Sequence, residues 1–282
     1  MQLGDRRIAC GKPHLVGILN LTDDSFSADG LSDDVASAVA RGVAMVAAGA
    51  DLLDIGAEST RPGAEPATIA LQCSRVVPVI AALRQAVQVP LSVDTQKAAV
   101  ADAALEAGAV MVNDVSGFGD PAMAAVVARH GAGWVLMHMP HATGEMGWTT
   151  RSRTMSADTR IGCAEVVADL GRRVDRAVAA GVQRDQLAVD PGVGFGKTLA
   201  QNLAFLLGPQ GLDKLGLPVY VGPSRKSFIG AVTGAPVDRR LMGTAAAVTA
   251  CVLAGATFVR VHDVAEMREV IDLARAMVDS AH

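Results

Sequence analysis

Two short stretches near the carboxyl end of the chain place polar and cationic side chains directly after buried strands. The first is the apolar run 219–221, which is followed by Ser-Arg-Lys at 224–226. The second is the run 258–261, where Arg260 and His262 share a face because residues two apart in a strand point the same way. A hydroxyl and cations beside a helix N-terminus bind anions, so the two stretches predict one pocket for a phosphate or a pyrophosphate. Two adjacent cations alone would equally fit a solvated helix start, and the second stretch favours the pocket.

The other predicted strands also end in polar side chains. These are Asn20 and Thr22, Asp54 and Glu58, Asp94 and Thr95, Asn113 and Asp114, His138, and Asp190. Two carboxylates and an amide, Asp94, Asn113 and Asp190, can hold the amidine edge of a flat heterocycle by charge-assisted hydrogen bonds of about 1.5–3 kcal/mol each when buried. Lys226 could neutralise one carboxylate or donate to a ring carbonyl. A structural role is an equal alternative for three of the acids: Asp54, Glu58 and Asp114.

One unit repeats along the chain: a short apolar run that ends in polar residues, followed by a longer Ala-rich helical stretch. The predicted strands are Leu15–Leu21, Asp51–Ile55, Leu91–Val93, Val110–Val112, Trp134–Met137, Leu187–Val189, Val219–Val221 and Phe258–Val261. The predicted helices lie near 35–49, 69–87, 96–107, 121–130, 157–180, 198–207, 239–255 and 265–280. Alternating strands and helices predict a parallel sheet. A spacing of about 35 residues is typical of a TIM (β/α)8 barrel, and eight regular units favour this closed α/β fold over a doubly wound open sheet.

No composition shift, linker or charge run divides the chain, so we expect one domain over 1–282. A small strand or hairpin is expected within residues 2–10. Two polar segments, 23–34 and 140–156, follow the first and fifth strands and are expected to act as lids or binding loops.

Composition narrows the function classes. The net charge of −4 argues against a nucleic-acid partner, which would normally require a basic excess. The stretch 244–259 is too short for a membrane span, and the N-terminus lacks the apolar run of a signal peptide, so we expect no membrane and a cytoplasmic location. The scattered cysteines predict free thiols in a reducing compartment: Cys10, Cys73, Cys163 and Cys251.

The glycine-rich stretch 192–198 is similar to a phosphate-binding P-loop but lacks one of its glycines. The Walker pattern requires glycine where Pro191 stands. We therefore expect a flexible loop through which backbone approaches a ligand, with Lys197 exposed.

The motifs ILNLT-DDSFS, ESTRPGA, SVDT, NDVSG, LMHM, DPGVGFGK, GPSRKSFIG, GTAAA and RVHDV occur in the order found in bacterial dihydropteroate synthases. The chain resembles this family from about residue 15 to residue 265. The resemblance implies a TIM barrel that condenses 6-hydroxymethyl-7,8-dihydropterin pyrophosphate with p-aminobenzoate, releasing pyrophosphate, in folate synthesis. It also implies a requirement for Mg²⁺, a homodimer, and competition by sulfonamide drugs for the p-aminobenzoate site.

The resemblance also implies a role for each matching residue. The polar edges of the pterin would be held by Asp94, Asn113, Asp190 and Lys226. Its slot would be lined by Val115, Met137, Phe195 and Gly222. The pyrophosphate would meet Arg260, which also stacks over the ring, together with His262 and the magnesium contact Asn20. The p-aminobenzoate subsite would comprise Phe26, Thr60, Arg61, Pro62, Ser224 and Lys226.

Catalysis in this interpretation follows from charge. Pyrophosphate leaves readily once Mg²⁺, Arg260 and His262 neutralise it, so departure can precede attack, with Asp94 stabilising the pterin cation and no strong general base required.

The first loop departs from the family pattern TPDSFSDGG, because Asp23 replaces proline and the second acid moves from position 28 to Asp29. One alternative is therefore a pterin-binding paralogue without synthase activity. A pterin-dependent methyltransferase is less favoured, because it would lack both anion-binding stretches. The apolar helices near 239–255 and 265–280 are expected to form a dimer face.

Overall fold

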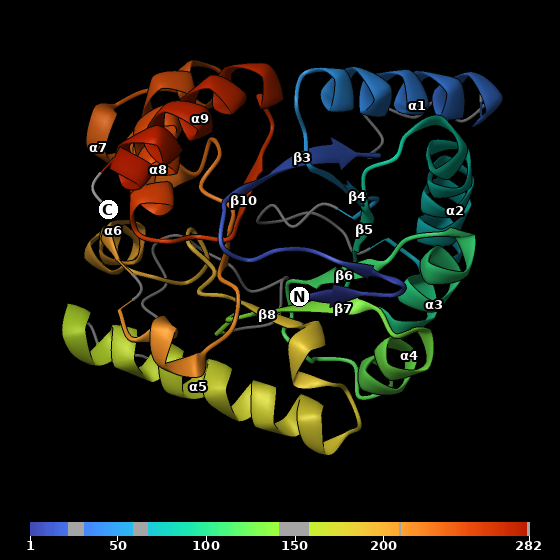
Figure 1. The fold of residues 1–282 in the computed structure, drawn as a ribbon, viewed down its shortest axis with the longest axis horizontal. Helices are drawn as coiled ribbons and strands as arrows, with labels where there is room; N and C mark the ends of the chain where they lie inside the picture. The colour runs from blue at the N-terminus through green and yellow to red at the C-terminus, as the bar shows by residue number, and fades with distance from the viewer. Residues whose placement is uncertain (22–30, 59–66, 141–157, 209, 281–282) are drawn as a thin grey trace.

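Eight parallel strands form the centre of the fold in a computed structural model that describes residues 1–21, 31–58, 67–140, 158–208 and 210–280 (Figure 1). The strands are β3 (His14–Asn20), β4 (Leu52–Gly56), β5 (Leu91–Asp94), β6 (Met111–Asp114), β7 (Gly133–Met137), β8 (Leu187–Asp190), β9 (Tyr220–Val221) and β10 (Phe258–Val261). Their order in the sheet is β8-β7-β6-β5-β4-β3-β10-β9. The edge strands meet through a bridge between Val189 and Val219 and a 3.0 Å hydrogen bond from the Val189 amide to the Pro218 carbonyl. These contacts complete the ring, so the predicted TIM barrel is confirmed.

Helices cover the outside of the barrel (Figure 1). They are α1 (Leu31–Ala47), α2 (Ile69–Ala86), α3 (Ala98–Ala107), α4 (Met123–His130), α5 (Thr159–Ala179), α6 (Leu199–Leu207), α7 (Ser227–Thr233), α8 (Leu241–Leu253) and α9 (Val264–Ser280). Short 3-10 helices occur at η3 (Arg184–Gln186), η4 (Leu212–Leu215) and η5 (Val237–Arg239). Local sequence fixes several helix starts: the Thr68 hydroxyl accepts from the Leu71 amide, and Thr198 forms a capping box with Gln201.

The predicted helix ranges do not include α7, although a helix start beside residues 224–226 was expected. The sequence suggested one helix near 239–255 after the seventh strand, whereas the structure places a separate helix of seven residues before it. Seven residues are too few to display a helical period. Gly234, at φ +72°, ends the helix in the left-handed conformation that glycine adopts readily.

The amino-terminal hairpin covers one end of the barrel. As predicted, β1 (Gln2–Leu3) pairs with β2 (Arg6–Arg7) in antiparallel register. Met1 and Leu3 are buried in a cluster with interior side chains of the strands, among them Tyr220 and Phe258. This hairpin closes the amino-terminal end of the barrel, and the polar strand ends described below lie at the opposite, carboxyl-terminal end.

Two predictions from the sequence concern the chain as a whole, namely membrane spans and the number of domains. No helix in the described part of the chain is long and apolar enough to cross a membrane. The expectation of a single domain over 1–282 stays a prediction.

Candidate active site

Arg260 joins the ends of several strands at the carboxyl end of the barrel. From β10, its Nε donates to Asp54 Oδ2 on β4 at 2.6 Å, and one Nη donates to Asp94 Oδ2 on β5 at 2.7 Å. Asn113 on β6 donates from Nδ2 to the same Asp54 oxygen at 2.9 Å. The structure therefore brings together Asp94, Asn113 and Arg260, and adds Asp54, for which a structural role was an equal alternative.

The charges of this cluster are strongly coupled. Burial raises the pKa of Asp94 to about 7; Arg260 opposes this increase and the Asp54 carboxylate adds to it. The two carboxylates in turn hold the pKa of Arg260 above its ordinary value, although burial of the guanidinium acts in the opposite direction. The permanent cation Arg260 is thus shared by Asp54 and Asp94. It cannot neutralise both carboxylates, so a hydrogen-bond donor of a ligand can still bind them.

Asp190 and Lys226 form the other side of the polar mouth. The Asp190 carboxylate accepts from the Gly192 amide at 2.6 Å, and burial raises its pKa to about 6. The Lys226 ammonium lies 3.6 Å from the centroid of the Phe195 ring, and its pKa is lowered to about 8, chiefly by burial and then by Arg260. Both groups therefore lose or gain a proton at a pH closer to neutrality than exposed side chains of the same type do.

The glycine-rich loop after β8 gives Lys226 its path. A Cβ added at Gly194 would lie 2.8 Å from Lys226 Cδ, and Gly194 adopts φ +85°. Glycine is therefore required here by close approach and by backbone conformation. The close approach seen here is that of the Lys226 stem; the expected approach of the loop backbone to a ligand stays a prediction.

Ser224 and His262 meet as the two cationic stretches predicted, but Arg225 does not join them. Ser224 Oγ lies 3.0 Å from His262 Nδ1 and also accepts from the His262 amide at 3.2 Å. Arg225, at φ +55°, bonds instead to Asp263, with Nε 3.0 Å from Oδ2. Its assignment to the anion pocket was therefore wrong, because the left-handed turn at this residue directs its side chain to Asp263.

His262 is neutral in this arrangement. Burial, and then Arg260, lower its pKa to about 4. The His262 amide donates to Ser224 Oγ, and the hydroxyl hydrogen can be donated to Nδ1, an arrangement that places the ring proton on Nε2.

An apolar cluster stands beside the polar residues. Val115, Met137 and Met139 pack together, with Phe195 against them. Met139 was missed, although residues 137 and 139 alternate as they would on one face of a strand. Gly222 lies beside Arg260, whose Cβ is 3.8 Å from the position of a Cβ at 222. The four residues predicted to line the slot thus occur on the segments that end β6 to β9.

Other predicted residues are placed less completely. Asn20 is the last residue of β3, opposite Gly56. Phe26, Thr60, Arg61 and Pro62 lie outside the described residues. Asp114 takes the structural alternative, because its carboxylate accepts from Ser116 and from the Phe118 amide in the turn after β6. The cysteines are free, as expected. Within the described ranges, no group of three or more His, Cys, Asp or Glu side chains could hold a metal ion.

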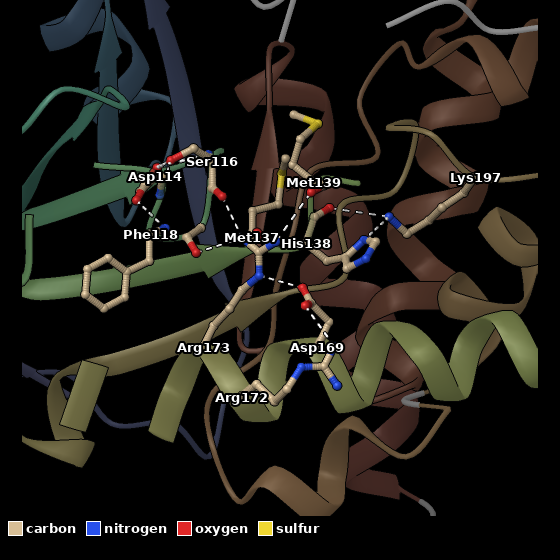
Figure 2. A network of polar contacts seen from close by, with 12 residues as sticks. Asp114, Ser116, Phe118, Met137, His138, Met139, Asp169, Arg172, Arg173 and Lys197 are labelled. Carbon is tan, nitrogen blue, oxygen red and sulfur yellow. Dashed lines mark hydrogen bonds and ion pairs between the residues drawn. The ribbon is translucent and has the colours of Figure 1, made fainter. Parts of the chain in front are cut away.

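Lys197 was expected to be exposed and is buried, at 8% exposure. Its ammonium donates to the carbonyls of Gly192 at 2.9 Å and Phe195 at 3.2 Å. It also lies 3.1 Å from His138 Nδ1 (Figure 2). Burial lowers its pKa to about 7. The loop curls around the side chain, a geometry that residue types alone do not reveal.

Comparison with known proteins identifies the family. The model of the pterin binding enzymes matches residues 16–262. The chain belongs to this family. Among its relatives, the dihydropteroate synthase of Mycobacterium leprae is 46% identical over 257 residues, covering 89% of this chain and 88% of the relative. That of Synechocystis is 41% identical, covering 94% of this chain and 90% of the relative.

Solved structures of the pterin-binding family agree with the fold. The Xanthomonas albilineans dihydropteroate synthase with 4-aminobenzoic acid has a TM-score of 0.86 at 39% identity, covering 98% of this chain and 97% of that chain. The Yersinia pestis enzyme in a sulfonamide drug complex has a TM-score of 0.89 at 36% identity, covering 99% and 100%. A further Xanthomonas albilineans structure contains 7,8-dihydropteroate, with a TM-score of 0.83.

Proposed function

We propose that the protein is a dihydropteroate synthase, a transferase that condenses 6-hydroxymethyl-7,8-dihydropterin pyrophosphate with p-aminobenzoate in folate biosynthesis. The observation that carries the proposal is the convergence of Arg260, Asp54, Asp94 and Asn113 beside an apolar slot. Relatives that bear the synthase name over nearly the whole chain favour this function, and nothing in the comparisons supports a paralogue without synthase activity.

The pterin ring is proposed to lie against Val115, Met137 and Phe195, with its polar edges toward the acids and Lys226. The buried carboxylates supply acceptors for the amidine edge, and Lys226 supplies a donor for the ring carbonyl. Burial raises the pKa values of Asp94 and Asp190. Hydrogen-bond donors of a ligand stabilise the charged forms of these acids, so the ligand is bound most strongly when both acids are ionised.

The reaction forms a bond between the arylamine nitrogen and the pterin methylene carbon. The carbon–oxygen bond to pyrophosphate breaks, its electron pair leaves with pyrophosphate, and the amine proton is lost to solvent. Arg260 supplies the permanent positive charge of the site, and His262 offers its Nε2–H as a donor to the leaving group. An anion beside His262 would raise its low pKa and strengthen that contact.

The p-aminobenzoate subsite is proposed to comprise Ser224 and Lys226 with the residues predicted from resemblance, Phe26, Thr60, Arg61 and Pro62. Sulfonamides would compete at this subsite. The Xanthomonas albilineans and Yersinia pestis structures with 4-aminobenzoic acid and a sulfonamide drug support it by similarity.

Mg²⁺ is proposed as the cofactor, with the Asn20 amide oxygen as its protein ligand. Mg²⁺ prefers oxygen ligands and is often held by one or two protein groups plus substrate phosphates. Asn20, the last residue of β3, would supply one oxygen donor to the ion. When bound, the ion would supply neutralising charge to the leaving pyrophosphate.

A cytoplasmic homodimer is also proposed. Large apolar side chains are exposed on consecutive helices α6 to α9, which lie together in Figure 1: Leu207, Val232, Met242, Leu253, Leu273 and Met277. Several large exposed apolar side chains on neighbouring helices support a protein interface. Free cysteines support a reducing compartment.

A steady-state assay tests the function. The pterin pyrophosphate, p-aminobenzoate and Mg²⁺ are supplied, and pyrophosphate release is followed with and without p-aminobenzoate. The proposal expects release that depends on p-aminobenzoate, with dihydropteroate as the product. Pterin pyrophosphate binding without dihydropteroate formation would instead indicate the non-synthase paralogue.

A further inference from the structure

Arg173 on α5 bonds to backbone carbonyls behind the apolar slot. One Nη donates to the carbonyls of Ser116 at 2.6 Å and Gly117 at 2.7 Å, in the turn after β6. The same nitrogen lies 3.4 Å from the Met137 carbonyl, and the other Nη lies 3.4 Å from that of Met139. The guanidinium thus contacts both segments that carry Val115, Met137 and Met139 (Figure 2).

Asp169 fixes the orientation of Arg173. Its Oδ2 accepts from Arg173 Nε at 2.5 Å, one helical turn earlier on α5. The arginine side chain is 20% exposed, and its donors face the carbonyls. A planar fork held at one edge presents its other donors in a fixed geometry.

Lys197 makes the equivalent connection on the other side of the slot. It contacts the carbonyls of Gly192 and Phe195 after β8 and faces His138 after β7. Arg173 and Lys197 therefore link the ends of three successive strands, β6, β7 and β8. The four residues of the apolar cluster lie on segments that these two cations hold: Val115, Met137, Met139 and Phe195.

The sequence accommodates Arg173 at Gly117. This glycine has φ +59°, and an added Cβ would collide with the Met137 carbonyl oxygen and with an Nη of Arg173. Asp114 accepts from Ser116 and from the Phe118 amide, so the same turn is held from both sides. A side chain at position 117 would displace the guanidinium, so these contacts require glycine at this position.

We infer that Arg173 and Lys197 are positioning residues that set the shape of the pterin slot by holding the backbone of its apolar walls. They act through Val115, Met137, Met139 and Phe195 and bind carbonyls, not substrate. The inference rests on the proposed function. Displacements of about 1 Å in a binding site can reduce activity roughly a hundredfold, so loosening these walls should weaken pterin binding well before the barrel unfolds.

The test compares Arg173→Met with Arg172→Met. Arg172 is the adjacent residue, also bonds to Asp169, and is 69% exposed, so it is a matched control. The dissociation constant for the pterin pyrophosphate is measured by calorimetry without p-aminobenzoate, and the melting temperature by scanning calorimetry. We expect a rise in the dissociation constant of roughly tenfold to a hundredfold for Arg173→Met and less than twofold for Arg172→Met.

Two further variants keep the inference testable if Arg173→Met does not fold. Lys197→Met removes the second cation, and Asp169→Asn removes the carboxylate that orients the guanidinium while Arg173 is retained. Both are expected to weaken pterin binding, whereas the KM for p-aminobenzoate at saturating pterin pyrophosphate should change less than twofold. Arg173→Lys, which keeps one donor group, should recover part of the lost affinity.

Folded variants of Arg173 and Lys197 that bind the pterin as the wild type does, with only a lower melting temperature, would overturn the inference in favour of a purely structural role. If the wild type and Arg172→Met themselves failed to bind the pterin, the proposed function would fail, and the inference with it. The control variant therefore distinguishes the two failures.

Discussion

At the scale of single residues, the position of Asp94 separates binding from turnover. Its carboxylate is bonded to Arg260 and lies beside Asp54, which can supply another acceptor for a ligand. We expect Asp94→Asn to lower kcat by roughly a hundredfold or more, because positive charge develops on the pterin only in the transition state. Pterin affinity should fall far less. Steady-state rates and calorimetric binding, measured together, check this; equal losses in both would contradict the cation-stabilising role.

Asp190 gives a residue-scale prediction about pH. Its pKa is raised to about 6 by burial, with the Gly192 amide and the cations Lys226, Lys197 and Arg260 opposing the increase. A ligand donor binds the ionised carboxylate, so pterin affinity should decline as the pH falls below about 6, approaching tenfold per pH unit. Asp94, whose pKa is about 7, adds a smaller decline that begins at higher pH and cannot exceed the affinity loss caused by Asp94→Asn.

Calorimetric titrations from pH 5 to 8 measure this dependence, with Asp190→Asn as the control variant. Asparagine does not titrate, so the step near pH 6 should disappear in the variant while the Asp94 contribution remains. An unchanged pH profile in Asp190→Asn would show that another group is responsible.

At the scale of elements, the loop after β8 should tolerate no side chain at Gly194. Alanine there would meet the stem of Lys226 and adopt an unfavourable left-handed conformation, which typically costs about 1–3 kcal/mol. We expect Gly194→Ala to lower both stability and pterin affinity, as measured by denaturant unfolding and calorimetry. Gly181→Ala is a matched control, because its φ is also positive but its Cβ would have nothing within 4 Å. It should lose stability without losing affinity.

The elements also show how far residue patterns could predict this site. The apolar runs predicted the strands closely, since strands buried on both faces read as short apolar segments. Because the strands of a closed barrel end around one mouth, their terminal side chains were expected to lie close together, as Asp94, Asn113 and Arg260 do. Arg225 was misplaced because its positive φ depends on tertiary contacts with Asp263 and Thr244. Arg173 was missed because an arginine on a helix surface gives no sign that distant carbonyls surround it.

At the scale of the whole molecule, the exposed apolar side chains of α6 to α9 predict self-association. Leu207 and Met242 are both 77% exposed. If this surface is the dimer face, Met242→Lys should produce a monomer at micromolar concentration, because an unpaired charge in an apolar interface is costly. Sedimentation velocity of the wild type and the variant checks this. Val43→Lys, an exposed apolar position on α1, is the control and should stay dimeric. A wild type that sediments as a monomer would contradict the proposal.

The junction between β8 and β9 has less backbone pairing than the ladder between β4 and β5, and hydrogen exchange can detect this difference. This junction consists of the Val189–Val219 bridge and the bond from the Val189 amide to Pro218, whereas β4 and β5 pair over four residues and the Leu53 amide donates to the Pro90 carbonyl beside that ladder. Local opening should therefore begin at this junction, and the Val189 amide should exchange faster than that of Leu53. Asp190 ends β8 and Lys226 follows β9, so a ligand held by both would tie the two sides together. Protection at Val189 should then report how fully the barrel is closed around its substrate.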